Sequence, residues 1–290
     1  MFLAELLKLR STRAPWVVGI VAVAGAVLVQ STTLLLPRLA DRLGGLGGTS
    51  SEIATDLVPD LTAMTDLGSA SVQRGMLDLL GNGPSGAGSV GVATLCLLIL
   101  GVLAGTTDFR TGGVVPTALV VPSRARVLLG KAGATAVAAL VIGVALAVVG
   151  ALGLAVAIAT TPGAGLAISG ADALATWVRG LCVLVALAWL GLGVGVLVRG
   201  QVAAIVVVVG AAFVEPLVQA TVALLSGGTS SAMSWLPLTL GSLASTGQGA
   251  SGLLGGSAAF GAGAALAGLA VWVVVVLGGG AVMFRRRDLT

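Results

Sequence analysis

A charged stretch between two apolar runs, residues 107–131, holds the side chains best suited to binding another molecule. It reads TDFRTGGVVPTALVVPSRARVLLGK and contains four of the fifteen Lys and Arg residues, two prolines and a Gly-Gly pair. Its charged residues are Asp108, Arg110, Arg124, Arg126 and Lys131. Charges of both signs beside fixed turns favour ion pairing with a protein surface over covalent chemistry.

The chain contains few of the residues and motifs that usually carry out enzymatic catalysis. The sequence has no histidine, which removes His-ligated zinc sites and Ser-His dyads. No Gly-x4-Gly-Lys-Ser/Thr phosphate loop occurs, and the closest stretch, Leu-Gly-Lys-Ala at 129–132, lacks the upstream glycine and the hydroxyl residue. Cys96 and Cys182 each fall inside an apolar run, away from any metal-ligand spacing. We therefore expect no metal, no bound cofactor and no catalysis by this polypeptide.

Two further charges lie within apolar runs, where an unpaired charge is unfavourable by about 2.5–3.5 kcal/mol. Helical rise places Arg179 about 9 Å below the outer end of its run, and Glu215 about 20 Å from the inner end of the next, in a core of about 30 Å. The similar depths suggest an ion pair between Arg179 and Glu215, or a polar part of a transport pathway. In the alternative, Arg179 extends outward and Glu215 contacts the backbone amide of a neighbouring helix.

The elements that carry these residues are membrane-spanning helices. Hydrophobic residues make up 57% of the chain and charged residues 9%, and the mean hydropathy is +1.11, which is far from the composition of soluble domains. Six runs approach the 20 or so apolar residues that a spanning helix needs. They cover 15–36, 88–105, 127–159, 173–198, 202–225, and a last run that begins between 253 and 263 and ends at Phe284. The sequence predicts an all-α integral membrane protein with one six-helix domain over residues 1–290.

The distribution of positive charge predicts the orientation of this domain, because Lys and Arg accumulate on the cytoplasmic side. With the N-terminus inside, eleven of the fifteen basic residues fall on inner segments, and these are Lys8, Arg10, Arg13, Arg110, Arg124, Arg126, Lys131, Arg199, Arg285, Arg286 and Arg287. Both termini are then cytoplasmic in a bacterial-type plasma membrane. The net charge of +4 requires no nucleic-acid partner.

Segments outside the spans have patterns of their own. Residues 1–14 place Phe2, Leu3, Leu6 and Leu7 on one helical face, which predicts an interfacial helix on the inner leaflet or, alternatively, a simple basic flank to the first span. Residues 37–87 form a long external loop, with short helices predicted near 49–64 and around Val72, Met76 and Leu80. Residues 226–256 form a second external segment, re-entrant or without fixed structure.

Glycine pairs at Gly101/Gly105 and Gly191/Gly195 fit the GxxxG helix-packing motif. A chain with 45 glycines in 290 residues contains several such pairs by chance. The motifs therefore predict no dimer interface.

The order of these features resembles the permease subunit of type-2 ATP-binding-cassette (ABC) exporters. The resemblance rests on the basic amphipathic N-terminal segment and on an acid-aromatic-Arg-x-Gly element followed by Pro-x-Arg and Lys. In this chain the matching residues are Asp108, Phe109, Arg110, Gly112, Pro122, Ser123, Arg124, Arg126 and Lys131. The layout agrees over all six runs, whereas the motif agreement is confined to about 25 residues. Asp108 replaces the more usual Glu, and Gly113 stands where Thr or Ser is common.

The resemblance implies a function that composition alone does not. The cytoplasmic segment 106–126 would contain the coupling helix that docks on a separate ATPase, with Asp108, Phe109, Arg110, Gly112, Pro122, Arg124 and Arg126 at the contact. Two ATPase subunits would bind the ATP, and a second permease copy or paralogue would complete the pathway in the lipid bilayer. A secondary transporter or channel subunit without an ATPase is the alternative.

Overall fold

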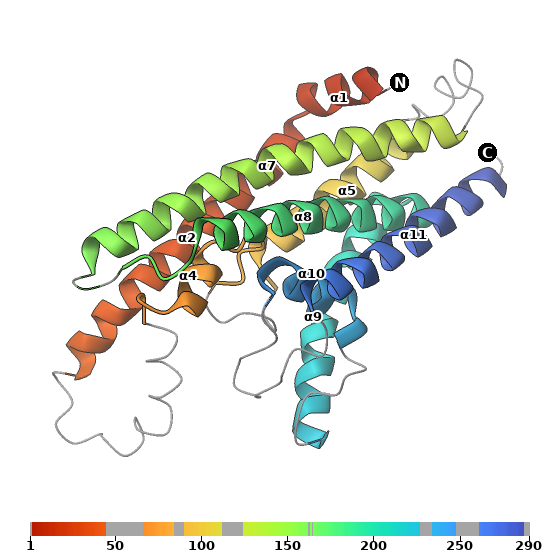
Figure 1. The fold of residues 1–290 in the computed structure, drawn as a ribbon. Helices are drawn as coiled ribbons and strands as arrows, with labels where there is room; N and C mark the ends of the chain where they lie inside the picture. Colours follow the sequence, from red (N-terminus) through yellow and green to blue (C-terminus); the bar gives the residue numbers. More distant parts are fainter. Residues whose placement is uncertain are drawn as a thin grey trace.

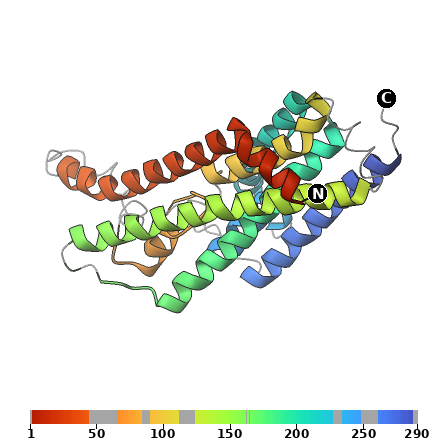
Figure 2. The ribbon, with the colours of Figure 1, turned by 90° about the horizontal axis from the view of Figure 1, so that it is seen from above.

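The structure is a computed structural model that describes residues 2–44, 66–83, 90–111, 124–161, 163, 165–226, 234–247 and 261–286. Over these residues the secondary structure is helical, and no strand occurs in them. The helices are α1 (Phe2–Ser11), α2 (Arg13–Gly44), α4 (Ala70–Met76), α5 (Val92–Thr111), α7 (Arg124–Thr160), α8 (Gly170–Val198), α9 (Gln201–Ser226), α10 (Pro237–Thr246) and α11 (Ala262–Arg286). Most of the long helices run side by side, while α9 projects away from them (Figures 1 and 2).

Five of these helices are long and apolar enough to cross a membrane. The qualifying segments are Arg13–Leu35, Ala125–Thr160, Gly170–Val198, Gln201–Val222 and Ala262–Met283. Four of the six predicted runs lie wholly within long helices, whereas the run 88–105 begins before α5, and the last run, predicted to begin between 253 and 263, begins with α11 at Ala262. The apolar part of α5, Val92–Asp108, is shorter than the qualifying segments. The protein is therefore an all-α, multi-pass membrane protein, and its sixth span stays a prediction.

Each end of the bundle carries a short helix. At one end, called here the α1 end, α1 lies close to the end of α5 and the beginning of α7 (Figure 1). At the other, called here the α10 end, α10 is joined to the segment that follows α4. A long helix such as α7, which has 37 residues, runs between the two ends.

The tightest helix contact joins α5 to α8, and the two GxxxG pairs form it. A Cβ added to Gly101 would stand 1.9 Å from the Ala188 carbonyl oxygen, and one added to Gly191 would stand 2.0 Å from the Leu98 carbonyl oxygen. Backbone touches backbone here, which any larger residue would prevent. The motifs thus serve packing within one chain, and α5 and α8 form a close pair at the centre of the bundle.

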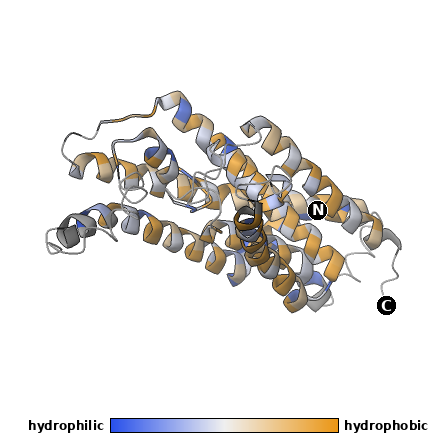
Figure 3. Ribbon diagram, turned by 90° about the horizontal axis from the view of Figure 1, so that it is seen from below, coloured by the Kyte–Doolittle hydropathy of each residue, from blue (hydrophilic) through white to orange (hydrophobic). Residues whose placement is uncertain are grey.

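Outward surfaces of the long helices are apolar. Exposed side chains on α2, α7, α9 and α11 include Leu28, Val141, Leu152, Val206, Phe213, Leu217, Val274 and Val275. Figure 3, coloured by hydropathy, shows hydrophobic residues along most of the length of these helices. A water-soluble protein rarely leaves so much apolar surface exposed, whereas lipid contact accounts for it.

The end of the first span differs from the sequence prediction. The first span was expected to give way to a loop at 37, but α2 continues through Pro37 to Gly44. Proline removes one backbone hydrogen bond, which need not end a long helix. The predicted turns near Val72 are confirmed as α4, whereas the predicted helix at 49–64 lies outside the described residues.

Candidate functional site

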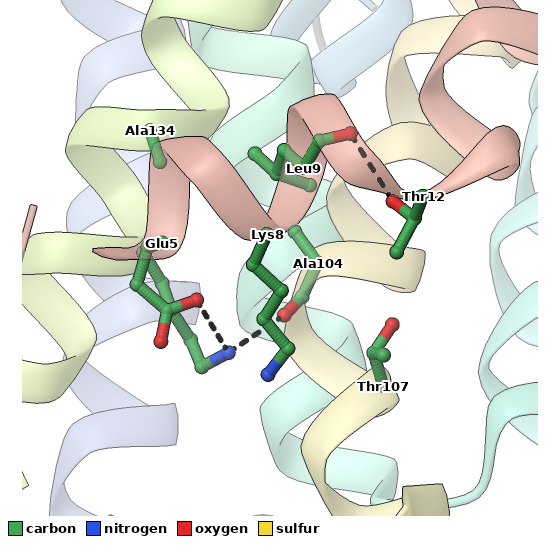
Figure 4. A pocket seen from close by; sticks show the side chains of 8 residues that line it. Glu5, Lys8, Leu9, Thr12, Ala104, Thr107 and Ala134 are labelled. Atoms are coloured by element: carbon green, nitrogen blue, oxygen red, sulfur yellow. Dashed lines mark hydrogen bonds and ion pairs between the residues drawn. The ribbon is translucent and has the colours of Figure 1, made fainter. Parts of the chain in front are cut away.

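The α1 end contains a buried cluster of four charges, Glu5, Lys8, Asp108 and Lys131, called here the ion cluster. Glu5 and Lys8 project from α1 toward the bundle, one turn apart (Figure 4), and Asp108 and Lys131 belong to α5 and α7, respectively. The two acidic and two basic side chains carry no net charge when all are ionised. Three separate helices thus meet through opposite charges.

Lys131 is the centre of the cluster. Its Nζ lies 2.5 Å from Asp108 Oδ2 and 3.3 Å from Glu5 Oε2, and it donates a hydrogen bond of 3.2 Å to the Ala104 carbonyl oxygen. Asp108 also pairs with Lys8 through its Oδ1. Asp108 is 3% exposed and Lys131 8% exposed, so water screens these pairs poorly.

Lys8 occupies the open side of the cluster. Burial lowers the pKa of its ammonium group, the positive charge of Lys131 lowers the pKa further, and the Glu5 carboxylate opposes both effects. The side chain is 36% exposed. A recess beside it is lined by Glu5, Lys8, Leu9, Thr12, Ala104, Thr107, Lys131 and Ala134 (Figure 4).

The amphipathic pattern of α1 explains why the cluster forms. Glu5 is buried against the bundle, whereas Leu3 and Leu7 are 69% and 64% exposed on the opposite face. An isolated helix in water would not turn its charges inward and its leucines outward, but a helix at a lipid surface does. A separate N-terminal helix is present, as predicted, but α1 spans Phe2–Ser11 and α2 already begins at Arg13. Its place on the inner leaflet stays a prediction.

Asp108 differs most from its predicted role. The resemblance placed it at the contact with a separate ATPase, but it lies inside α5, which continues to Thr111, and its carboxylate is bound within the chain. Lys131, expected on an inner segment, is buried as well. Opposite charges hold both side chains between helices, so neither is free on the surface.

The remaining predicted contact residues lie in or next to the segment 112–123, which is outside the described residues. That segment contains Gly112 and Pro122 and the expected coupling helix. Phe109 and Arg110 belong to the last turn of α5 and Arg124 to the first of α7, but the positions of their side chains lie outside the description. Arg126 is exposed on α7. The structure therefore brings the two ends of the 107–131 stretch to one place.

The proposed ion pair between Arg179 and Glu215 is wrong. Glu215 accepts hydrogen bonds from the backbone N–H of Leu238 and Thr239 at the beginning of α10, so the alternative, a neighbour's backbone amide, is what the structure has. Arg179 lies near Gly247, at the other end of α10, and donates to the Thr176 hydroxyl at 3.5 Å. A ten-residue helix is about 15 Å long, so it keeps the two groups apart.

A second buried carboxylate at the α10 end was missed by the sequence analysis. Asp78 accepts a hydrogen bond of 2.6 Å from the Ser245 hydroxyl and weaker ones from the N–H groups of Leu80 and Asn82. Burial raises the pKa of the Asp78 carboxyl, and these three hydrogen bonds oppose the rise. Only the sequence Asp-Leu-Leu-Gly-Asn at 78–82, whose polar and glycine residues are typical of a turn, pointed to a fixed role.

The described residues contain no group of three or more His, Cys, Asp or Glu residues that could hold a metal ion. No protein-family model matches the chain, and no curated protein matches it. The function must therefore be argued from the ion cluster, the α10 end and the pattern of charges.

Proposed function

We propose that this chain is the permease subunit of a type-2 ABC exporter, with the stretch 107–131 as its contact to a separate ATPase. Six apolar helices, a basic amphipathic N-terminal helix and the Asp-Phe-Arg-x-Gly element support this assignment. The α1 end would face the cytoplasm, because eleven of the fifteen Lys and Arg residues belong to it in that orientation. The membrane would be a plasma membrane of bacterial type.

The ion cluster is the observation that carries the proposal. Helix α5 ends at Thr111 and α7 begins at Arg124, on either side of the contact segment, and Lys131 joins these two helices through its ion pair with Asp108. Glu5 and Lys8 attach α1 to the same point. A force applied to the segment would therefore reach α1, α5 and α7 together.

Such an arrangement is suited to transmitting the movement of a soluble ATPase to the membrane helices. A loop with loose ends would absorb the movement of a partner, whereas clamped ends pass it on as a rigid-body displacement. From α5 the displacement would continue into α8, because the two backbones are in direct contact at Gly101 and Gly191 and would move together. ATP would be bound by the partner, since this chain has no phosphate loop.

One copy of this chain would form half of a transport unit, so a second half is required. Two copies of the chain, or one copy and a paralogue, would enclose the pathway between them, with two ATPase subunits below. The apolar outward faces of α2 and α9 are available for lipid or for the second half. The chemistry of the described residues does not select a substrate class.

The test is co-purification of an ATPase from native membranes in mild detergent. Asp108 is unsuitable for substitution because its loss would unpair the ion cluster. We would instead reverse one charge on each side of the segment, Arg110→Glu with Arg124→Glu, and use Arg10→Glu as the matched control, since Arg10 is exposed on α1 and outside the segment.

The wild type and the Arg10→Glu protein are expected to retain an ATPase that hydrolyses ATP, and the double variant is expected to lose it while remaining monodisperse. Loss in the control as well would assign the binding to general positive charge. If the intact wild-type protein retains no ATPase, the coupling proposal is wrong. A secondary transporter or channel subunit would then be the better assignment.

A further inference from the structure

The short helix α10 lacks a cap of its own. Its N-cap position is Leu236, whose side chain makes no capping hydrogen bond, and its first helical residue is Pro237. The first N–H groups of a helix need acceptors, and within a membrane protein water is not freely available to provide them. Yet the residues from Leu240 to Thr246 are all buried. Another part of the chain must supply the acceptor.

Glu215 on α9 supplies it. Its Oε2 accepts from the Leu238 N–H at 3.1 Å, and its Oε1 accepts from both the N–H and the hydroxyl of Thr239 at 2.7 Å. Gln219, one turn further along α9, donates to the same Thr239 hydroxyl. A negative charge at a helix N-terminus is also favoured by the helix dipole. One helix is therefore capped by the carboxylate of another.

The other end of α10 is held in the same manner. The hydroxyl of Ser245, in the last turn, donates to Asp78, which belongs to the segment after α4. Asp78 is itself fixed by the backbone N–H groups of Leu80 and Asn82. The hydrogen-bonded pairs join residues 23 and 24 positions apart at the first end and 167 positions apart at the second.

Both attachments use neutral donors. Among the described residues, the ion pairs involve only the ion cluster at the α1 end. Arg179 and Arg74 pair with neither carboxylate. A hydrogen bond between a carboxylate and a neutral donor can be exchanged for hydrogen bonds to water when a segment becomes exposed, at a smaller cost than breaking a buried ion pair. Such attachments hold a segment without making its release prohibitive.

The helix that carries the Glu215 anchor is packed loosely against the rest of the chain. Only 22% of the apolar window of α9 is buried inside the chain, compared with 56% for α8, while the windows of α2 and α11 are also little buried, at 11% and 22%. Pro216 follows Glu215 directly and removes a backbone hydrogen bond at that point, which is where long helices bend. A bend of α9 at Pro216 would move the carboxylate and leave the first N–H groups of α10 without an acceptor.

We propose that α10 is a gate at its end of the bundle, latched by Glu215 at its N-terminus and by Asp78, through Ser245, at its last turn. Bending of α9 withdraws the first latch, the uncapped α10 loosens, and the external end of the pathway opens. The role as a gate rests on the proposed transport function and orientation. The latches are a property of the chain alone, so they are measured without the ATPase.

Hydrogen exchange of the full-length protein in lipid nanodiscs, read by mass spectrometry at one pH, tests the latches. Glu215→Leu removes the acceptor, Glu215→Gln weakens it, and Ser245→Ala removes the second attachment. Asp172→Asn is the matched control, because Asp172 is an exposed acid in the first turn of α8. The peptide from 237 to 246 reports on α10, and the peptide from 183 to 192 reports on the centre of α8.

Exchange in α10 is expected to accelerate about tenfold or more in Glu215→Leu and by a smaller factor in Glu215→Gln, with the amides after Leu236 affected first. In Ser245→Ala the last turn is expected to accelerate first. Asp172→Asn should match the wild type, and the α8 peptide should be unchanged throughout. Unchanged α10 exchange in Glu215→Leu would overturn the proposal. So would equal acceleration of α8 and α10, because Glu215 would then support the whole fold.

A cysteine in α10 tests the gate and its side. Ala244 is fully buried, and Ala244→Cys should react slowly with a membrane-impermeant maleimide added outside intact cells. In the Glu215→Leu background the reaction should be faster from outside and unchanged from inside, after subtraction of the parent that lacks the new cysteine. Equal rates in both backgrounds, or entry from the inner side, would overturn the gate. Neither result would alter the outcome of ATPase co-purification.

Discussion

The two ends of the molecule solve one structural problem in different ways. Each end has a ten-residue helix, α1 or α10, that is attached to the rest of the chain through two carboxylates. At the α1 end the carboxylates of Glu5 and Asp108 face lysines. At the α10 end those of Asp78 and Glu215 face hydroxyl and backbone N–H groups. The α1 end is thus held by charge pairs, and the α10 end by neutral donors.

This difference has an energetic consequence. Removing one partner of a buried ion pair leaves an uncompensated charge and typically destabilises by about 3–5 kcal/mol. A hydrogen bond between a charged and a neutral group contributes about 1.5–3 kcal/mol. The α1 end should therefore resist separation, as a transmission point must, whereas the α10 end should open more readily.

The largest effect is expected for Lys131→Met. Methionine keeps the length and most of the volume of lysine, but it leaves Asp108 with Lys8 alone and Glu5 with no cation. We expect a loss of about 3–5 kcal/mol, seen as poor yield or a clearly lowered thermal unfolding midpoint in detergent. The comparison between the two ends would fail if Lys131→Met unfolds at the wild-type temperature.

Two controls sharpen this result. Arg126→Met removes an exposed cation from α7, five residues before Lys131, and should change the unfolding midpoint little. The double variant Lys131→Met with Asp108→Leu removes one charge of each sign and leaves Glu5 and Lys8 to pair with one another. It should recover most of the lost stability, because an apolar pair can replace a buried ion pair.

Sequence patterns predicted the helices well because a spanning helix is marked by a long local run of apolar residues. They could not predict the ion cluster, since Lys8 and Asp108 are 100 residues apart and Glu5 and Lys131 are 126 apart. The charges were visible, but nothing in one sequence says which of them meet. For Asp108, a motif that suggested an external contact concealed an internal one.

The error at Arg179 and Glu215 has a different cause. Helical rise estimates how deep a residue lies, but it does not give the direction in which the side chain points around its helix. It also cannot reveal a third helix that approaches from a later segment. The beginning of α10 reaches Glu215 first, and its N–H groups satisfy the carboxylate. The sequence also could not show what the glycine motifs pack against, because only the fold shows that Gly101 and Gly191 face one another.

An intermediate effect is expected from pH at the α10 end. Burial raises the pKa of Asp78 in the folded protein above its value of 3.8 in the unfolded chain. The folded state then binds the proton more strongly, so the stability from this group is present below the unfolded pKa and is lost as pH rises through the folded pKa. One such group changes the free energy of unfolding by at most about 1.4 kcal/mol per pH unit.

Asp78→Asn isolates that contribution, since asparagine keeps an acceptor for the backbone N–H groups and does not titrate. The thermal midpoint of the wild type, measured from pH 4 upward, should fall relative to that of Asp78→Asn. A difference between the two proteins that does not change with pH would show that the carboxyl keeps its ordinary pKa. The neutral donors would then dominate over burial, and the α10 end would be held more firmly than we infer.

The smallest effect is expected for Lys8→Gln, which tests whether charge alone makes the α1 end firm. Lys8 pairs with Asp108 as Lys131 does, but its side chain is 36% exposed, compared with 9% for Lys131. Water screens an exposed pair, and Asp108 keeps its second cation, so the expected loss is about 1 kcal/mol or less. Double-mutant cycles of Lys8→Gln and Lys131→Met with Asp108→Asn would measure both pairings by thermal unfolding. A coupling energy for Lys8 equal to that for Lys131 would mean that burial does not set the strength of the cluster. The stability of the α1 end would then depend on the number of ion pairs and not on their burial. The contrast with the α10 end would rest on the presence of charge pairs alone.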